Sequence, residues 1–220
     1  MSKLTIFPSA APGAPLVVLN TFEGEGGQVH EACRAAGTPD FTLAEVSDFA
    51  WDDDLTPWPC PPLRKREHPF GGKADAFLER LTGELLQQIR AGLPAEPDYT
   101  VIAGYSLAGL FALYAAWCSE AFAAAVSASG SLWYPDFTAF LREHPPQPVL
   151  RTVYLSLGDA EPRTRHPLMG AVGQDTEETA AILRDRGLRT TFEWNEGNHF
   201  RDEDLRTAKG IRWVLENGVY

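Results

Sequence analysis

The stretch AGYSLAGLFALYAAW, residues 103–117, places a serine between a short apolar run and a long one. The residues before it, YTVIAG (99–104), are rich in β-branched and apolar side chains, which predicts a strand. From Leu107 to Trp117 every residue but one glycine is apolar or aromatic, which predicts a helix buried on all sides. A strand that turns directly into a buried helix is the repeating unit of α/β folds, so this stretch decides the fold class.

The same alternation of strand and helix patterns recurs along the chain. Further strand-like runs lie at residues 15–20, 42–47, 123–129, 152–158 and 189–195, and LTIF (4–7) is expected to form an additional edge strand. Helical patterns lie at about 73–90 (Phe77, Leu81, Leu85, Ile89), at 176–186, and in a final helix lined by Leu205, Ala208, Ile211 and Leu215. This order predicts one α/β domain over residues 1–220, with a mainly parallel central sheet and helices on both faces.

One long segment, residues 48–72, shows no regular pattern. It contains WDDDLTPWPCPPLRKREHPFGG (51–72), which is rich in proline and has two tryptophans. Long loops in compact domains are often functional, and the tryptophans favour an ordered loop that packs on the body. We therefore expect this segment at the rim of a site, with Trp58 as a candidate substrate contact.

Composition limits the class of partner. The net charge of −11 over 220 residues argues against nucleic acid or an anionic membrane as the main partner. The three cysteines are far apart and lack zinc spacing, and no signal-peptide layout or membrane-spanning apolar run is visible. We expect a cytoplasmic protein that acts on a small molecule without a metal or organic cofactor.

The turn around Ser106 has the layout of a nucleophile elbow, in which a strained strand-to-helix turn exposes a hydroxyl. Gly104 and the pair Ala108-Gly109 provide room around it, although Ala108 stands where the strict motif has glycine. The helix start adds a positive dipole end, and the Leu107 amide is the expected first donor to an oxyanion. Tyr105, beside the serine, is a further candidate for substrate contact.

A serine nucleophile needs a base, and the base needs an orienting acid. In this type of fold their chain order is serine, acid, histidine. His199 lies in the loop between the last strand and the last helix, where the base is expected. Asp159 and Glu161 both follow the strand at residues 152–158, and either can orient the imidazole.

The second oxyanion donor is expected from the loop after an early strand. LNTFEGEGG (19–27) follows the strand at residues 15–20, is rich in glycine and leads into a helix. The candidate amides are those of Thr21 and Phe22.

Four stretches together resemble a known family: AGYSLAG, SASGSLWYPDF (127–137), YLSLGDAEPRTRH (154–166) and GNHF (197–200). From Leu16 to Leu215 the chain is similar to esterases of the α/β-hydrolase superfamily, in the esterase D-like group that includes siderophore (trilactone) esterases. The resemblance implies Ser106 as nucleophile and His199 as base. It implies Glu161 as acid, three residues after the strand-end glycine, with Asp159 as the alternative. It also implies that Trp133 and Tyr134 line the acyl or alcohol pocket.

These residues predict a serine hydrolase that cleaves carboxylic esters, siderophore esters among them, through an acyl-serine. An acyltransferase on the same residues is one alternative, and a binding protein with a hydrolase-like fold is another. Arg163 and Arg165 flank the proposed acid. They are most simply solvated loop residues, but if they faced the pocket they would favour an anionic ester.

Overall fold

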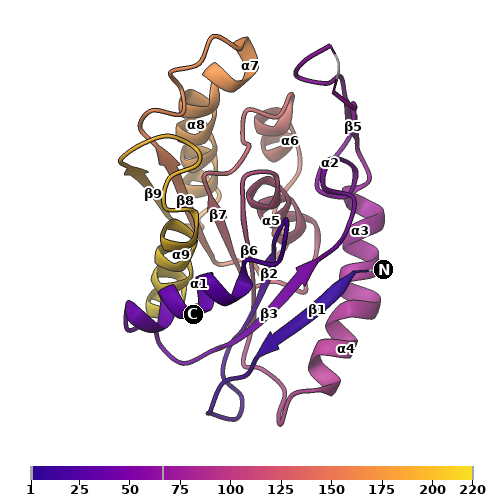
Figure 1. Cartoon of the computed structure of the whole chain (residues 1–220), viewed down its shortest axis with the longest axis vertical. Coiled ribbons are helices and arrows are strands. Elements are labelled where there is room, and N and C mark those ends of the chain that lie inside the picture. The colour runs from indigo at the N-terminus through magenta and orange to yellow at the C-terminus, as the bar shows by residue number, and fades with distance from the viewer. Residues whose placement is uncertain (1, 66, 220) are drawn as a thin grey trace.

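The structure is a computed structural model that describes residues 2–65 and 67–219. Its main sheet has seven strands in the order β1-β3-β2-β6-β7-β8-β9 (Figure 1). Every neighbouring pair is parallel except β1 with β3. The predicted fold class is confirmed, and so is the N-terminal edge strand. The strands are β1 (Lys3–Phe7), β2 (Leu16–Asn20), β3 (Thr42–Ser47), β6 (Thr100–Tyr105), β7 (Ala124–Ala128), β8 (Thr152–Gly158) and β9 (Arg189–Asn195).

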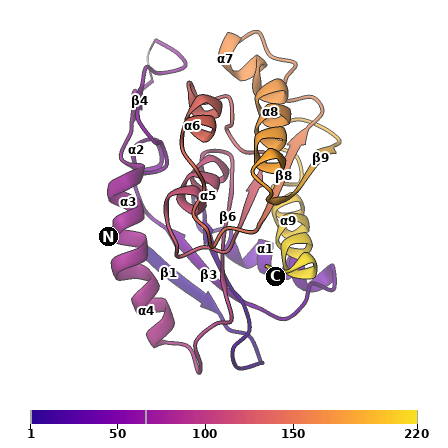
Figure 2. The ribbon, with the colours of Figure 1, turned by 180° about the vertical axis from the view of Figure 1, so that it is seen from behind.

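Helices cover both faces of this sheet, which Figures 1 and 2 show from opposite sides. On one face α1 (Gly26–Ala35) packs on α9 (Glu203–Asn217), which lies on β7 and β8. On the other face α5 (Leu107–Cys118) lies on β6 and β7, and α8 (Val172–Asp185) lies on β8 and β9. The remaining helices are α2 (Trp51–Asp54), α3 (Ala74–Arg80), α4 (Leu86–Ala91), α6 (Phe137–Glu143) and α7 (Pro167–Gly170). None of the helices in the described residues is long and apolar enough to cross a membrane.

The sheet therefore separates two apolar cores, and successive side chains of a central strand point alternately into one core and the other. Leu16 and Val18 of β2 belong to the core under α5, whereas Val17 and Leu19 belong to the core under α1 and α9. All five residues of β2 are buried, which explains why this strand reads as a continuous apolar run rather than an alternating one.

The predicted helix at residues 73–90 contains a π-helical turn, η1 (Leu81–Leu85), between α3 and α4. Its apolar residues recur every fourth position, and on a straight α-helix such a row drifts by about 40° at each step. The wider π turn counteracts this drift. As a result Phe77, Leu81, Leu85 and Ile89 are all buried in one core.

The segment at residues 48–72 is more regular than predicted. It contains α2 and a two-stranded hairpin of β4 (Pro59–Cys60) and β5 (Phe70–Gly71). The indole Nε1 of Trp58 donates to the Pro135 carbonyl at 2.9 Å, and the Tyr134 hydroxyl donates to the Trp58 carbonyl at 2.6 Å. These two bonds fix the segment to the loop before α6.

Two further expectations were wrong in detail, and two helices were missed. The helix predicted from residue 176 begins at Val172, and α6 and α7 were not predicted. Leu205 was placed on the buried face of the last helix, but it is 55% exposed. The buried face of α9 instead includes Arg206.

Candidate active site

Ser106 lies at the junction of β6 and α5 in a strained backbone conformation, with φ 59° and ψ −124°. A residue other than glycine in this region costs on the order of 1–3 kcal/mol and persists only where its surroundings impose it. Here the Ser106 amide donates to the Ala128 carbonyl at 3.2 Å, and the Ser106 carbonyl accepts from the Ser131 amide at 2.9 Å. Ala128 ends β7 and Ser131 lies three residues after it, so the neighbouring strand and its following loop hold the turn in place.

Gly104 allows the helix to approach the strand at this turn. A Cβ on Gly104 would lie 2.3 Å from the backbone carbon and oxygen of Ala108. That separation is far below van der Waals contact, so any side chain there would displace the start of α5. The small residues of the motif thus serve the geometry that exposes the Ser106 hydroxyl.

Ser106, His199 and Glu161 form a chain of hydrogen bonds at the carboxyl edge of the sheet. The Ser106 Oγ lies 3.0 Å from His199 Nε2, and His199 Nδ1 lies 2.7 Å from Glu161 Oε2. A carboxylate only accepts hydrogen bonds, so Nδ1 carries the proton and the neutral ring leaves Nε2 free to accept from the serine. This arrangement can deprotonate the hydroxyl as it attacks an electrophile.

Of the two candidate acids, the structure brings Glu161 and not Asp159 to the imidazole. The Glu161 side chain is 6% exposed, and its Oε1 accepts from the Gly158 amide at 2.7 Å. The Asp159 carboxylate is half exposed and accepts from the Gly197 amide at 2.8 Å. Asp159 therefore fastens the loop that carries His199, two residues before the imidazole.

Arg206 of α9 is a buried cation behind this site that sequence reasoning missed. Its side chain is 3% exposed. Its Nη1 lies 3.3 Å from Glu161 Oε1 and 3.1 Å from both the Tyr105 hydroxyl and Ser129 Oγ. Its Nη2 donates to the Glu196 carbonyl at 2.9 Å. One guanidinium thus joins the acid, the elbow strand and the loop that leads to His199.

Tyr105 supports the base from the other side. Its hydroxyl donates to the His199 carbonyl at 2.8 Å and accepts from Arg206. Burial raises the pKa of Tyr105 to about 12, although its bond to Ser129 and the charge of Arg206 act in the opposite direction. The hydroxyl therefore stays protonated at neutral pH and holds the backbone of the histidine.

Of the candidate oxyanion donors, Leu107 opens α5, where the first amides of a helix lack intrahelical partners. The Thr21 amide donates to the Val46 carbonyl at 3.0 Å, so it is committed to the sheet and does not face a substrate. The Phe22 amide has no hydrogen-bond partner among the described residues. Of the three candidate amides, those of Leu107 and Phe22 therefore remain.

The buried carboxylate of Glu45 anchors the loop that presents Phe22. Its Oε1 accepts from the Thr21 hydroxyl at 2.8 Å and from the Gly26 amide at 2.5 Å. A Cβ on Gly26 would lie 2.6 Å from this carboxyl carbon, so the glycine permits the contact. The loop is thereby held at both ends.

Two cavities meet at Ser106 and His199. The first has a volume of about 380 Å³ and the second about 1070 Å³. Trp51, Asp52, Glu67 and Phe200 line both of them. Ser106 thus stands between two compartments of one cleft.

Comparison with known proteins identifies the family of the chain. A sequence model of the family described as "Putative esterase" matches residues 44–202. The chain belongs to this esterase family. A search of the curated proteins found no significant match.

Solved structures of hydrolases share the fold of this esterase-family protein. Siderophore hydrolase EstA from Aspergillus nidulans has a TM-score of 0.75 at 18% identity, over 99% of this chain and 90% of its own. An IroE-like serine hydrolase from Shewanella oneidensis has a TM-score of 0.79 at 17% identity, over 98% and 76%. The enterobactin esterase FES from Shigella flexneri has a TM-score of 0.71 at 20% identity, and the chain spans 56% of its length.

The predicted substrate-contacting aromatics divide into two groups. Trp133 lines the first cavity and Tyr105 lines the second. Tyr134 and Trp58 line neither, because they bond to each other and to the loop before α6. Trp51, which was assigned only to the rim segment, instead stands between the two cavities.

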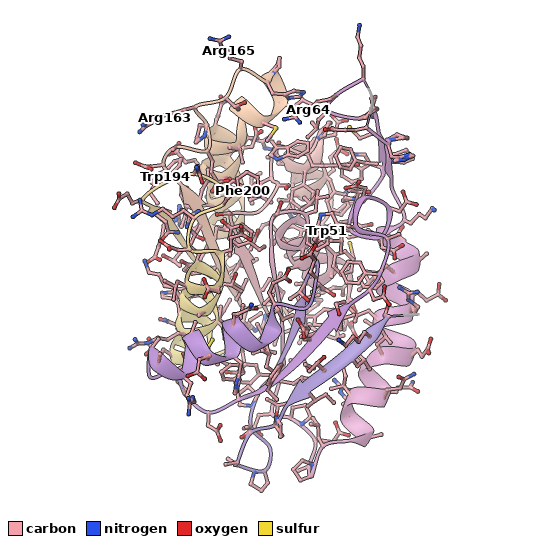
Figure 3. All side chains as sticks on the ribbon, in the orientation of Figure 1. Trp51, Arg64, Arg163, Arg165, Trp194 and Phe200 are labelled. Atoms are coloured by element: carbon pink, nitrogen blue, oxygen red, sulfur yellow. The ribbon has the colours of Figure 1, made fainter. Side chains whose placement is uncertain are left out.

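Arg163 and Arg165 do not face the cleft. Both are exposed, and Figure 3 shows their side chains directed outward, Arg165 at the top of the molecule and Arg163 at its upper left. Arg163 pairs with Asp159 at 3.7 Å. The idea that these arginines select an anionic ester is therefore not supported, and the solvated interpretation fits both residues.

Proposed function

We propose that this protein hydrolyses small carboxylic esters through an acyl-serine intermediate on Ser106. The observation that carries the proposal is the continuous hydrogen-bond chain from Ser106 through His199 to Glu161. It lies on a strained elbow at the carboxyl edge of a parallel sheet, in a member of an esterase family. One fold can host many different chemistries, so the role of Ser106 is argued from the geometry of these three side chains.

Each step uses a group whose position is described above. Ser106 Oγ attacks the ester carbonyl while His199 Nε2 takes its proton, and Glu161 stabilises the resulting imidazolium. The amides of Leu107 and Phe22 bind the oxyanion. His199 then protonates the leaving alcohol, and a water molecule activated by the same imidazole releases the acid from Ser106.

The neighbouring structures suggest where substrate screening starts. Two of them are named as a siderophore hydrolase and an enterobactin esterase. At 18% and 20% identity they share the fold, so a siderophore ester is one class to be tested beside simple aryl and alkyl esters.

The test compares wild type with Ser106→Ala, His199→Ala and the control His144→Ala. His144 bonds to Phe140 and lines neither cavity. We expect hydrolysis of p-nitrophenyl acetate and butyrate, and labelling by a fluorophosphonate, in wild type and in the control. Ser106→Ala loses labelling and turnover, and His199→Ala loses turnover. Wild-type activity that survives in Ser106→Ala, or its complete absence together with absence of labelling, contradicts the proposal.

A further inference from the structure

The two cavities beside Ser106 differ in chemical character. Beyond the wall that both share, the first is lined by the apolar side chains of Leu63, Phe70, Trp133, Met169 and Val172, with His68 and Ser131 as further polar groups. The second carries polar and acidic groups, which are Asn20, Glu25, Gln28, Asp202, Glu203, Asp204 and Thr207. No lysine or arginine of the described residues lines either one. An ester bound across Ser106 would thus have its two halves in unlike surroundings.

The acidic cavity holds more negative charge than its surroundings neutralise. Six carboxylates line it, counting Asp52 and Glu67 of the shared wall. Glu67 pairs with Arg64 at 3.5 Å, and Asp202 pairs with Arg201 at 3.4 Å. The other four, Glu25, Asp52, Glu203 and Asp204, have no cationic partner within 4.0 Å among the described residues.

Asp52 has a raised pKa, mainly because of its partial burial and only secondarily because of its negative neighbours. These neighbours are Asp53 and Glu67, and the nearby His68 only partly offsets their effect on the pKa. A positive group placed in the cleft relieves this repulsion, whereas an anion adds to it.

A buried, unpartnered polar group in this cavity also points to a ligand. Asn20, at the end of β2, is 2% exposed, and neither its carboxamide nitrogen nor its oxygen bonds to a described residue. Buried amides without partners cost about 1–3 kcal/mol, so proteins seldom keep them unless another molecule satisfies them. Asn20 offers both a donor and an acceptor at the edge of the acidic cavity.

Exposed aromatic rings frame the same opening. Phe22 is 60% exposed and meets Trp51 edge to face, with ring centroids 5.1 Å apart. Phe200 is 80% exposed, and Figure 3 shows Phe200 and Trp51 near the centre of the view. Aromatic faces beside carboxylates are the surroundings in which proteins bind ammonium groups.

We infer that the cleft selects esters of mixed character, with an apolar half in the first cavity and an ammonium-bearing half in the acidic cavity. This inference rests on the proposed function, because it names the substrate class of the same serine. Glu25, Asp204 and Asp52 are then specificity-determining residues, and Asn20 binds a polar group of the same half. The reaction remains hydrolysis, in which water adds across the ester to give an acid and an alcohol.

The test uses matched esters that differ only in charge. One series consists of phenylacetate esters of choline, of its neutral isostere 3,3-dimethylbutan-1-ol, and of the anionic isethionic acid. A second pair carries the charge on the acyl side, as phenyl esters of 4-(trimethylammonio)butyrate and of 5,5-dimethylhexanoate. Values of kcat/KM are measured for wild type, for Glu25→Gln/Asp204→Asn, and for the control Glu79→Gln/Glu120→Gln. The control pair removes the same charge from exposed sites that line neither cavity.

We expect wild type and the control to prefer the cationic member of at least one series by about tenfold, with the anionic ester slowest. The preference falls to about two- to threefold in Glu25→Gln/Asp204→Asn, and it shrinks in about 0.5 M sodium chloride. Fluorophosphonate labelling of Ser106 is followed in parallel. Labelling without a preference for a cationic ester, or with equal loss of preference in the control, overturns the inference and leaves the nucleophile in place. Absence of both labelling and hydrolysis overturns the proposed function itself.

Discussion

Replacing Glu161 by Gln changes one oxygen to an amide nitrogen, and the surroundings dictate which one. Oε1 accepts from two donors, the Gly158 amide at 2.7 Å and Arg206 Nη1 at 3.3 Å. The amide oxygen must therefore take this position, because an NH₂ group there would face two donors. The NH₂ then points at His199 Nδ1, which turns from donor to acceptor. The proton moves to Nε2, where it faces the Ser106 hydroxyl, and the imidazole can no longer act as a base.

The size of this effect follows from the two orientations of the amide. Each buried donor left without an acceptor costs about 1–3 kcal/mol, so the reversed amide is disfavoured by about 2 kcal/mol or more. A difference of 1.4 kcal/mol is already tenfold, so the inactive tautomer dominates. In serine proteases the equivalent acid-to-amide change lowers kcat about 10⁴-fold. We expect Glu161→Gln to lower kcat/KM by about 10³–10⁴, which is about 4–5.5 kcal/mol of transition-state stabilisation.

The assay is kcat/KM for p-nitrophenyl acetate, with Asp159→Asn as the matched control from the same turn. Asn at position 159 keeps an acceptor for the Gly197 amide, so we expect a loss below about tenfold. The free energy of unfolding is measured for both variants in urea, to separate tautomer effects from loss of structure. A Glu161→Gln enzyme within tenfold of wild type, or an Asp159→Asn enzyme equally impaired, refutes this reasoning.

Three further outcomes test the surroundings of the site. Arg206→Met leaves a buried carboxylate without its cation and lowers the free energy of unfolding by about 3–5 kcal/mol, while Arg206→Lys loses less; urea denaturation checks both. Gly104→Ala forces a Cβ to within 2.3 Å of the Ala108 backbone, and we expect it to abolish fluorophosphonate labelling. Its control Gly83→Ala, where no atom lies within 4 Å of the added Cβ, raises the free energy of unfolding by about 0.5–1 kcal/mol. Labelling of Gly104→Ala, or a strong loss of stability in Gly83→Ala, contradicts this expectation. Because the folded pKa of Tyr105 lies above its unfolded value, its stabilising contribution is complete below pH 10.0 and is lost as pH rises toward about 12; denaturation of wild type and Tyr105→Phe across this range shows a steeper decline in wild type, and parallel curves refute the assignment.

The sheet and the turn around Ser106 could be predicted because they depend on local patterns. All six main strand predictions fall within one residue of a strand, since a buried parallel strand must be continuously apolar. The serine turn is also local: small residues are required where strand and helix meet. The rim segment at residues 48–72 was harder, because a single helical turn and two-residue strands carry no periodic signal.

The details of the site depend on contacts between distant residues. Asp159 and Glu161 lie in one turn, and only the direction of its side chain decides which carboxylate contacts the His199 imidazole. The Thr21 amide bonds to the Val46 carbonyl because β2 and β3 are adjacent in the sheet, and this pairing cannot be read from the sequence. Arg206 looks like a surface residue of the last helix. Gly210, one turn later on the same face, was a weak sign that this face packs closely on the sheet. A Cβ at position 210 would lie 2.5 Å from Val126 and 2.6 Å from Tyr154.

The position of Arg206 in α9 has a consequence for how activity arises during synthesis. The serine, the acid, the base and the buried cation occur at positions 106, 161, 199 and 206, so each part of the site is translated after the one before it. β2, β6 and β7 precede α9 in the chain, and the acid has no counter-charge from Arg206 until α9 docks on β7 and β8. A nascent chain that ends before α9 therefore displays the serine turn without a competent base. Under the proposed function, we expect ester hydrolysis only in chains long enough for α9 to dock on the sheet.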